Sequence, residues 1–221
     1  MRPLIHSMFG LRAAVVCAAL AIGAPAIFAH GTGAEHEAPV QQDAAAANRE
    51  AVDVTLHDLE LLNQDDERVK FASDVLGDKL VAVTFFYSSC TTTCPITNAI
   101  FAQLQSRLGE RLGREVQLVS LTVDPVTDTP RRLASFSAKF QRKPGWTWLT
   151  GEKQDVDRVL EGLGAYSPDY SLHPVMVMVG DPRSRRWSRL FGFPKPEAIV
   201  AKLDELEAAR TRASLSTDKE Q

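Results

Sequence analysis

The sequence has few cysteines and no strong excess of one charge. Only Cys17, Cys90 and Cys94 occur among 221 residues, and 25 Lys and Arg against 28 Asp and Glu give a formal net charge of −3. Three cysteines are too few for a disulfide-stabilised scaffold, so any function of these thiols must be local and chemical. A weakly acidic chain is poorly suited to a phosphate backbone, so we expect no nucleic-acid partner. With 13 Gly, 12 Pro and no repeat, the chain is neither collagen-like nor wholly disordered.

The first 29 residues have the pattern of an export signal. Basic residues near the start precede a charge-free apolar run that ends in small residues, over 13–29. We expect cleavage after Ala26 or Ala29; the alternative is an uncleaved membrane anchor, because a run of about 17 residues is at the lower limit for a spanning helix. Cys17 would leave with a cleaved signal. The segment predicts an exported, periplasmic protein, either soluble or tethered to the inner membrane through residues 13–29.

Composition divides the rest of the chain into three parts. Residues 30–50 have almost no large apolar side chains, which is typical of a flexible linker. Residues 210–221 are similar and are expected to form a disordered tail. The remaining residues, 51–209, are enough for one domain with a hydrophobic core of its own.

Apolar patterning in this domain predicts strands that alternate with helices. Two dense apolar runs, at 80–87 and 116–123, indicate strands buried on both faces. The other expected elements are helices over 95–112, from Thr129 onward, around 156–163 and around 199–206, and hairpin strands at 175–179 and 187–191. This order predicts an α/β fold of the thioredoxin-like type, a three-layer sandwich with a central mixed sheet.

Cys90 and Cys94 lie where the first buried strand meets its helix. Functional groups of α/β sheets gather at the carboxyl ends of strands. A spacing of four positions across a helical turn lets two thiols bond to each other or hold one metal ion. We expect Pro95 at the first helical position, which would put Cys94 at the helix cap, where the dipole lowers a thiol pKa. A pair of inert, buried cysteines is the alternative.

His173 is a candidate third ligand. It directly precedes the expected strand 175–179, which adjoins the cysteine-bearing strand in a thioredoxin-like sheet. Two thiolates and one neutral imidazole make a soft donor set that suits Cu(I), and also Cu(II) with an added ligand. Structural zinc usually takes four ligands, and only three are found. The alternative is a loop histidine without a ligand role beside a dithiol redox pair.

The sequence resembles the Sco/SenC family at four ordered landmarks, which together span most of residues 51–205. They are a C-x-x-x-C-P signature after an apolar strand, a D-P-x-x-D-T strand end, an L-T-G segment and a histidine eight residues before an Asp-Pro turn. In this chain these are Cys90-Thr91-Thr92-Thr93-Cys94-Pro95, Asp124-Pro125-Val126-Thr127-Asp128-Thr129, Leu149-Thr150-Gly151, and His173 before Asp181-Pro182.

The resemblance implies a redox-active copper protein that assembles the dinuclear copper centre of cytochrome c oxidase. Carried over to this sequence, Cys90, Cys94 and His173 would be the copper ligands, through Nδ1 or Nε2 of the histidine. The cargo would be Cu(I), Cu(II) or both. The expected partner is the copper-binding subunit of the oxidase, or another copper or thiol client. We expect a metallochaperone rather than an enzyme, in which a Cys90–Cys94 disulfide would release or block copper.

Two enzymatic functions are alternatives. A thiol-disulfide oxidoreductase acting on a partner's cysteines would use the same redox-active pair and is compatible with copper delivery. Thr91-Thr92-Thr93-Cys94 also resembles the T-x-x-C segment of peroxiredoxins. A thiol peroxidase of that kind would need Thr91 and an arginine near Cys94, and would have no use for His173.

Overall fold

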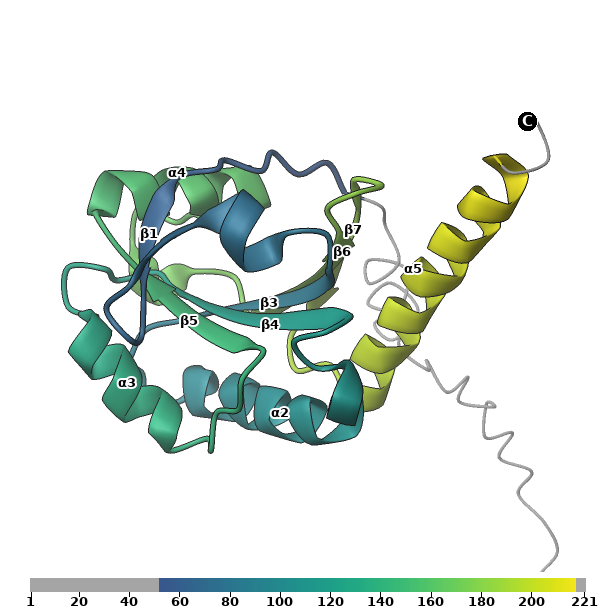
Figure 1. Ribbon diagram of the computed structural model, residues 1–221. Coiled ribbons are helices and arrows are strands. Elements are labelled where there is room, and N and C mark those ends of the chain that lie inside the picture. Colours follow the sequence, from purple (N-terminus) through teal and green to yellow (C-terminus); the bar gives the residue numbers. More distant parts are fainter. Residues whose placement is uncertain (1–51, 218–221) are drawn as a thin grey trace, which may run out of the picture. The chain divides into compact units, whose positions relative to one another are not determined.

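A seven-stranded mixed sheet forms the centre of the protein (Figure 1). The computed structural model describes residues 52–217; the expected signal and linker segments, at 1–50, lie outside these residues. The strands are β1 (Glu60–Asn63), β2 (Arg68–Lys70), β3 (Leu80–Phe86), β4 (Val116–Thr122), β5 (Trp146–Thr150), β6 (Met176–Asp181) and β7 (Arg186–Phe191). Their order is β2-β1-β5-β4-β3-β6-β7, with β3, β4 and β5 parallel and the outer pairs antiparallel. The predicted α/β fold with a central mixed sheet is confirmed.

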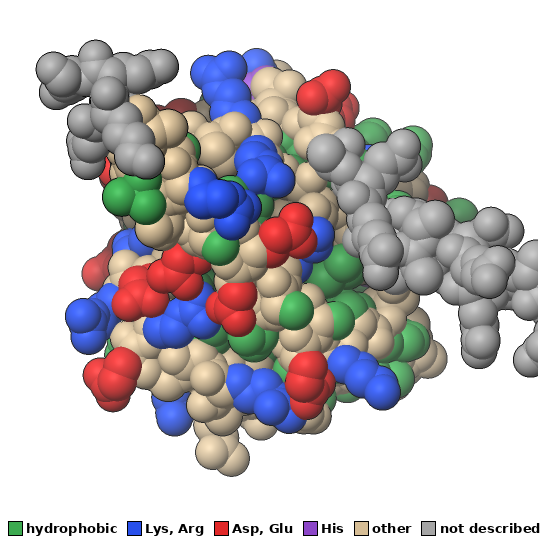
Figure 2. Space-filling view, turned by 90° about the vertical axis from the view of Figure 1, so that its right-hand side faces the viewer, with side chains coloured by type: hydrophobic (Ala, Val, Ile, Leu, Met, Phe, Trp, Pro, Cys, Tyr) green, Lys and Arg blue, Asp and Glu red, His purple; other side chains and the backbone are tan. Residues whose placement is uncertain are grey.

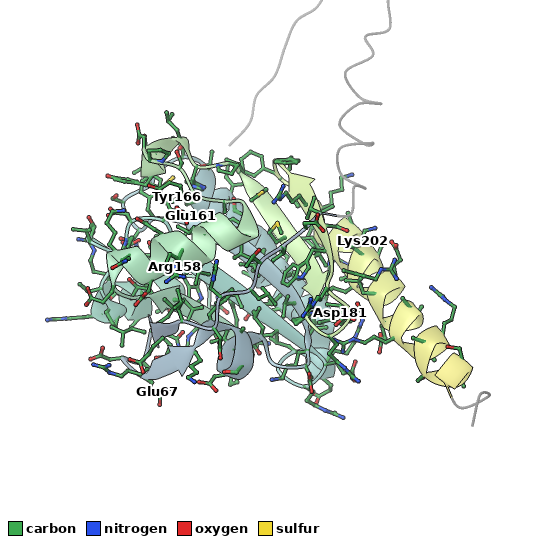
Figure 3. All side chains as sticks on the ribbon, turned by 90° about the horizontal axis from the view of Figure 1, so that it is seen from above. Glu67, Arg158, Glu161, Tyr166, Asp181 and Lys202 are labelled. Carbon is green, nitrogen blue, oxygen red and sulfur yellow. The ribbon has the colours of Figure 1, made fainter. Side chains whose placement is uncertain are left out.

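Helices cover both faces of this sheet. They are η1 (Phe71–Leu76), α2 (Thr93–Leu108), η2 (Gly109–Arg111), α3 (Pro130–Ala138), α4 (Lys153–Leu163), η3 (Tyr170–Leu172) and α5 (Pro196–Thr217). Residues of α2, α3 and α5 share one hydrophobic core, and residues of α4 and η1 share the other. Figure 3 looks onto the second face, where α4 presents Arg158 and Glu161 on its outer side. Within residues 52–217, no helix is both long enough and apolar enough to cross a bilayer.

Successive side chains of the central strands point to opposite faces of the sheet, so each strand contributes to both hydrophobic cores. Ala82 and Phe86 of β3 pack toward α2, whereas Val81 and Val83 pack toward the opposite face. An aromatic cluster fills the first core beneath α2 and α3, and consists of Phe86, Phe101, Phe136, Phe140, Trp146 and Trp148. Large buried rings make a major contribution to core stability. Phe136 of α3 packs on Phe86, the last residue of β3, so the cluster holds α3 beside the end of this strand.

Several elements differ from the sequence prediction. The apolar pattern predicts no strand at β5, although Leu149 and Thr150 at its end belong to the L-T-G motif. α2 ends at Leu108, four residues before the expected end at position 112, because Gly109, with φ of 52°, turns the chain there. α5 continues to Thr217, well into the expected tail. The first half of this helix packs on the sheet through Ile199, Leu203 and Leu206. The alanines that follow have high helix propensity and favour its extension.

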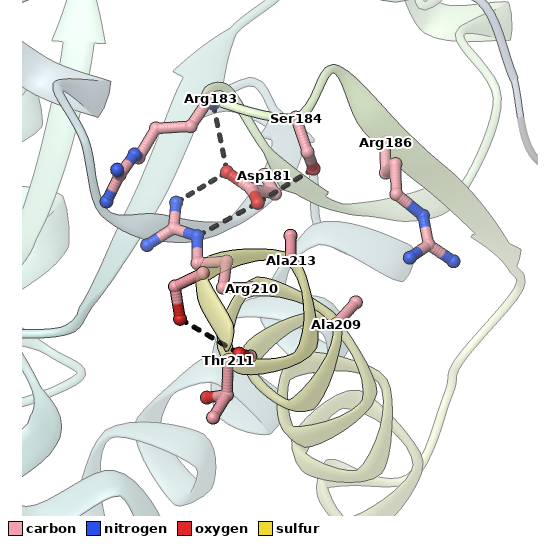
Figure 4. Close-up of a pocket in the computed structure, with 9 residues that line it drawn as sticks. Asp181, Arg183, Ser184, Arg186, Ala209, Arg210, Thr211 and Ala213 are labelled. Carbon is pink, nitrogen blue, oxygen red and sulfur yellow. Dashed lines mark hydrogen bonds and ion pairs between the residues drawn. The ribbon is translucent and has the colours of Figure 1, made fainter. Parts of the chain in front are cut away.

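An ion pair joins α5 to the end of β6. This end of the sheet is opposite the one where β3 ends. Asp181, at the end of β6, accepts hydrogen bonds from Nε of Arg210 at 2.9 Å and from Oγ of Ser184 at 2.8 Å (Figure 4). Burial opposes ionisation of this carboxyl, but the Arg210 and Ser184 hydrogen bonds outweigh it and lower the pKa of Asp181 to about 2. Figure 2 shows this side of the molecule, where acidic and basic side chains are intermingled.

Candidate metal and redox site

The two cysteines and His173 belong to segments that meet at one edge of the sheet. Cys90 lies in the loop after β3, and Cys94 lies in the first turn of α2. His173 follows η3 and precedes β6, which runs antiparallel to β3 with Thr84 opposite Val177. The start of β6 therefore adjoins the end of β3, which is the edge where α/β sheets carry their functional groups.

The sulfur of Cys90 serves as the cap of α2. The helix begins at Thr93, so Cys94 is its second residue; the prediction that Cys94 is the cap and Pro95 the first helical residue is wrong. Thr92, at the N-cap position, makes no capping hydrogen bond. Instead, the Cys94 N–H donates to Sγ of Cys90 at 3.4 Å, and the Thr93 hydroxyl lies 3.6 Å from the same sulfur. Cys90 therefore faces the positive end of the helix dipole.

This arrangement gives the two thiols opposite protonation behaviour. Burial disfavours the Cys90 thiolate, but hydrogen bonds from the Cys94 thiol and from nearby N–H and hydroxyl groups outweigh it and lower the pKa of Cys90 to about 6. Burial, followed by the hydrogen bond that it donates to Cys90, raises the pKa of Cys94 to about 12. The prediction of a lowered pKa at Cys94 is therefore wrong. In the reduced protein these shifts favour the thiolate at Cys90 and the protonated thiol at Cys94.

Tyr87 connects the thiol pair to His173. Its ring centroid lies 6.1 Å from that of His173, in an edge-on arrangement, and 5.1 Å from that of Tyr170. Burial, followed by a side-chain hydrogen bond with Cys90, raises the pKa of Tyr87 to about 12. Tyr87 is thus a neutral phenol in contact with both halves of the predicted site.

His173 is held as a neutral imidazole. Its side chain is buried, and Nδ1 lies 3.2 Å from the carbonyl oxygen of Pro174. A neutral ring in this contact carries its proton on Nδ1, which leaves the lone pair on Nε2. Burial lowers the pKa of His173, with the Pro174 hydrogen bond acting in the opposite direction. The free Nε2 has the chemistry of a ligand for a soft metal.

The predicted ligands are only partly assembled. Cys90 and Cys94 are in contact, whereas His173 packs against Tyr87. Among residues 52–217, no three His, Cys, Asp or Glu side chains lie close enough together to hold a metal ion. A three-ligand site therefore requires His173 to approach the sulfur atoms.

A buried carboxylate fixes the start of the cysteine loop. Asp128, which is fully buried, accepts hydrogen bonds from the N–H of Ser88 at 3.0 Å, from the Ser88 hydroxyl, and from Oγ1 of Thr122 at 2.6 Å. The D-P-x-x-D-T pattern pointed to this residue, but its role depends on a loop 40 positions away in sequence. Asp128 thus ties the loop before Cys90 to the end of β4.

A second set of buried hydrogen bonds reaches Cys94 from β5. Nε1 of Trp146 donates to Oγ of Ser120 at 3.0 Å, and Ser120 Oγ donates to Oδ1 of Asn98 at 3.1 Å. Nδ2 of Asn98 then donates to the carbonyl oxygen of Cys94 at 3.0 Å. An indole N–H can only donate, so it sets the direction of every bond in the series. No sequence motif links these three residues, because they lie on three elements that are far apart in the chain.

A thioredoxin-like sheet with a cysteine pair at the start of its first long helix defines a class of thiol and metal proteins, and comparison with known proteins identifies the family. The SCO1/SenC family model matches residues 48–206, more than half of the chain. The chain therefore belongs to the SCO1/SenC family, as the sequence motifs predicted.

Two curated relatives are similar over part of their length. A putative copper-binding protein of Stutzerimonas stutzeri is 29% identical over 106 residues, which are 48% of this chain and 50% of that protein. A SCO1 protein homolog of Bacillus subtilis (strain 168) is 33% identical over 93 residues, which are 42% of this chain and 47% of that protein. The matched region thus spans about half of each relative.

Solved structures support the same fold. A SCO1/SenC family lipoprotein from Bacillus anthracis str. Ames aligns with a TM-score of 0.61 and 25% identity, over 73% of this chain and 99% of that one. Arabidopsis thaliana ScoI, solved with copper bound, aligns with a TM-score of 0.57 and 20% identity, over 68% and 96%. The predicted thioredoxin-like fold is confirmed by these likenesses.

Proposed function

We propose that this protein is an exported copper metallochaperone, in which Cys90, Cys94 and Nε2 of His173 hold one copper ion. The observation that carries the proposal is the Cys90 sulfur, which accepts a hydrogen bond from the Cys94 N–H at the start of α2 and so lies beside the second thiol. Copper-binding relatives and membership of the SCO1/SenC family support the choice of copper. The client proposed is the copper-binding subunit of cytochrome c oxidase, to which the protein delivers copper or whose cysteines it prepares.

Copper binding requires two changes in this structure. Cys94 must lose the proton that it donates to Cys90, so binding releases a proton and strengthens as pH rises. Nε2 of His173 must also come closer to the two sulfur atoms, because the described residues contain no assembled group of three ligands. Because the ring is already neutral, protonation of His173 does not compete with copper at pH 7.

Copper titration of the protein tests this function. The reduced form is expected to bind one equivalent of Cu(I) and the disulfide form none. His173→Ala is expected to weaken binding by at least about tenfold while the domain stays folded. His57→Ala is the matched control, because His57 lies beside Gly162 of α4 rather than at this edge. Equal affinities for the wild type and His173→Ala would remove His173 from the site.

A thiol-disulfide oxidoreductase is the second candidate. The pKa of about 6 at Cys90 favours it, since the thiolate is the form that attacks a disulfide. Failure of the reduced protein to bind copper, together with rapid exchange with a disulfide substrate, would select this function. A peroxiredoxin-like peroxidase is less well supported, because its reactive thiol would be Cys94, which is buried and protonated.

The location of the protein is part of the proposal. Export to the periplasm, soluble or tethered through residues 13–29, follows from the sequence pattern of a segment that lies outside the described residues. Fractionation of cells expressing the full chain, with and without residues 1–29, tests it. Recovery of the full-length protein in the cytoplasm would contradict export.

A further inference from the structure

One segment of this weakly acidic chain carries charge of a single sign. Residues 130–145, which form α3 and the connection to β5, contain five Lys and Arg and no Asp or Glu. Four of these side chains are exposed and have no ion pair with the described residues; we name them the basic strip, and they are Arg131, Arg132, Lys139 and Lys143. The fifth, Arg142, pairs with Asp65 at 3.3 Å.

Three members of the basic strip, Arg131, Arg132 and Lys139, border the cysteine loop. A surface hollow of about 280 Å³ is lined by Ser88, Arg131, Arg132, Ser135, Phe136 and Lys139, with no carboxylate among them. Ser88 is two residues before Cys90, and Asp128 holds it in place. Figure 1 shows α3 on the same side of the sheet as α2, the helix that begins beside Cys90. A partner seated in this hollow would therefore contact the loop that carries Cys90.

The opposite edge of the sheet differs. There the hollow between β7 and α5 contains the Asp181 carboxylate, paired with Arg210, and the adjoining surface mixes both signs of charge (Figures 2 and 4). Arg111 makes three ion pairs on that side, with Glu115, Asp204 and Glu207. The hollow beside Ser88, by contrast, is lined by three cations and no carboxylate.

The position of two of these cations is unfavourable for the fold. Arg131 and Arg132 occupy the first turn of α3, where the helix dipole favours acidic side chains, and no acidic residue is present there. Folding alone gives no reason for this arrangement. Replacing both with glutamate suits the helix better, so a charge-reversed variant should fold normally.

We propose that the basic strip is a docking surface for an acidic segment of a thiol-carrying partner protein. The occupant is a protein rather than a membrane because the hollow includes Ser88, two residues before Cys90, so that whatever binds there lies against the cysteine loop. The proposal rests on the proposed function for the chemistry that follows docking. It adds what the client must look like: carboxylates beside its cysteines.

Exchange between the disulfide form of the protein and a reduced dithiol peptide measures this preference. One peptide thiolate attacks Sγ of Cys90, the Cys90–Cys94 bond breaks, and Cys94 leaves as a thiolate that takes up a proton. The second peptide thiolate then attacks the peptide sulfur of the mixed disulfide and releases the Cys90 thiolate. The peptide loses two electrons and forms its own disulfide, while the protein gains two.

The probes are two synthetic peptides of equal length and cysteine spacing, one with glutamates and one with lysines beside the cysteines. With the wild type, the acidic peptide is expected to react about tenfold faster at ~50 mM salt, a difference that should shrink at ~500 mM. The double variant Arg131→Glu/Arg132→Glu should remove or reverse this preference. Its matched control is Arg183→Glu/Arg186→Glu, the same change of charge at the opposite edge.

Equal rates for the two peptides with the wild type would overturn the proposal. So would an equal effect of both double variants, since that would indicate net charge rather than a local surface. Copper titration separates this result from the proposed function: Arg131→Glu/Arg132→Glu should bind copper as the wild type does. If the wild type binds no copper, the metallochaperone proposal fails, whereas the peptide preference can still be measured.

Discussion

The side-chain amide of Asn98 donates a hydrogen bond to the carbonyl oxygen of Cys94 at 3.0 Å. Both residues are in α2, one turn apart, and both are buried. Because Ser120 and Trp146 fix the orientation of the amide, its NH₂ group is held toward the cysteine and its oxygen away. The positive end of the amide dipole thus faces the first turn of α2, whose Cys94 N–H donates to the Cys90 sulfur.

Asn98→Ala is expected to make the reduced pair less stable. Loss of the NH₂ group should raise the pKa of Cys90 and make the disulfide potential more negative by on the order of 10–30 mV, since about 30 mV corresponds to ~1.4 kcal/mol for two electrons. Equilibration with glutathione buffers measures the potential. Ser120→Ala should shift it in the same direction, and the double variant should shift it by less than the sum, because both act through one set of bonds.

Gln105→Ala is the control for a purely structural effect. Gln105 is a buried amide on the same helix, and it donates to the carbonyl oxygens of Phe140 and Gln141 and accepts from the N–H of Lys143. Its loss should lower the free energy of unfolding by about 1–3 kcal/mol, much as loss of Asn98 does. The potential should stay at the wild-type value. A potential that shifts equally in Gln105→Ala would show that Asn98 acts only through stability.

The reactivity of Cys90 should follow its low pKa. Alkylation of the reduced protein by iodoacetamide is expected at Cys90, with a midpoint near pH 6, because the thiolate fraction rises as pH passes that value. Cys94→Ala removes the thiol that donates to Cys90, so the midpoint should move toward ~8.5, the value of a free thiol. Peptide mass spectrometry assigns the modified residue. Preferential modification of Cys94 would contradict the structure.

The sequence was sufficient to locate the cysteine pair but not to assign their protonation. β3 and β4 were predictable because each is a continuous apolar run, and the motif after β3 then had to lie at the carboxyl edge of the sheet. Cys90, rather than Cys94, has the lowered pKa because its sulfur caps α2. Which sulfur caps the helix depends on a shift of about two residues in the position where the helix begins. No local pattern specifies that boundary, since Pro95 is acceptable at several positions of the first turn.

Long-range polar contacts were also beyond the sequence. Asn98 and its partner Ser120 are 22 positions apart in the sequence, and Ser120 and its partner Trp146 are 26 apart. Only the folded sheet brings them together. β5 escaped prediction because Trp146–Thr150 is a short run in which a strand and a loop motif are hard to distinguish. The basic strip was hidden by the whole-chain charge of −3, which averages over a local excess.

Asp128→Asn should loosen the loop before Cys90. Both oxygens of the Asp128 carboxylate accept hydrogen bonds. In asparagine an NH₂ group replaces one of these oxygens and faces a donor, so that hydrogen bond is lost and the free energy of unfolding is expected to fall by about 1–3 kcal/mol. Hydrogen exchange should accelerate at residues 88–92. Asp58→Asn is the control, because Asp58 accepts from the N–H groups of Ala72 and Ser73 and from the Ser73 hydroxyl but is exposed. Equal losses in both variants would mean that burial of Asp128 adds nothing.

The Asp181–Arg210 ion pair should make stability depend on pH in the acid range. The pKa of Asp181 is about 2 in the folded protein against 3.8 for a free carboxyl, so the folded state releases this proton more readily. The resulting stabilisation is fully present above pH ~4 and is lost as pH falls through about 2, below which both states are protonated. Asp181→Asn should therefore lower the free energy of unfolding at pH 7 by about 1–3 kcal/mol, and by progressively less toward pH 2. Urea titrations of both proteins at several pH values measure this convergence. A difference between wild type and variant that is constant from pH 7 to pH 2 would show that the carboxylate charge does not contribute, and that the hairpin is held to α5 by packing.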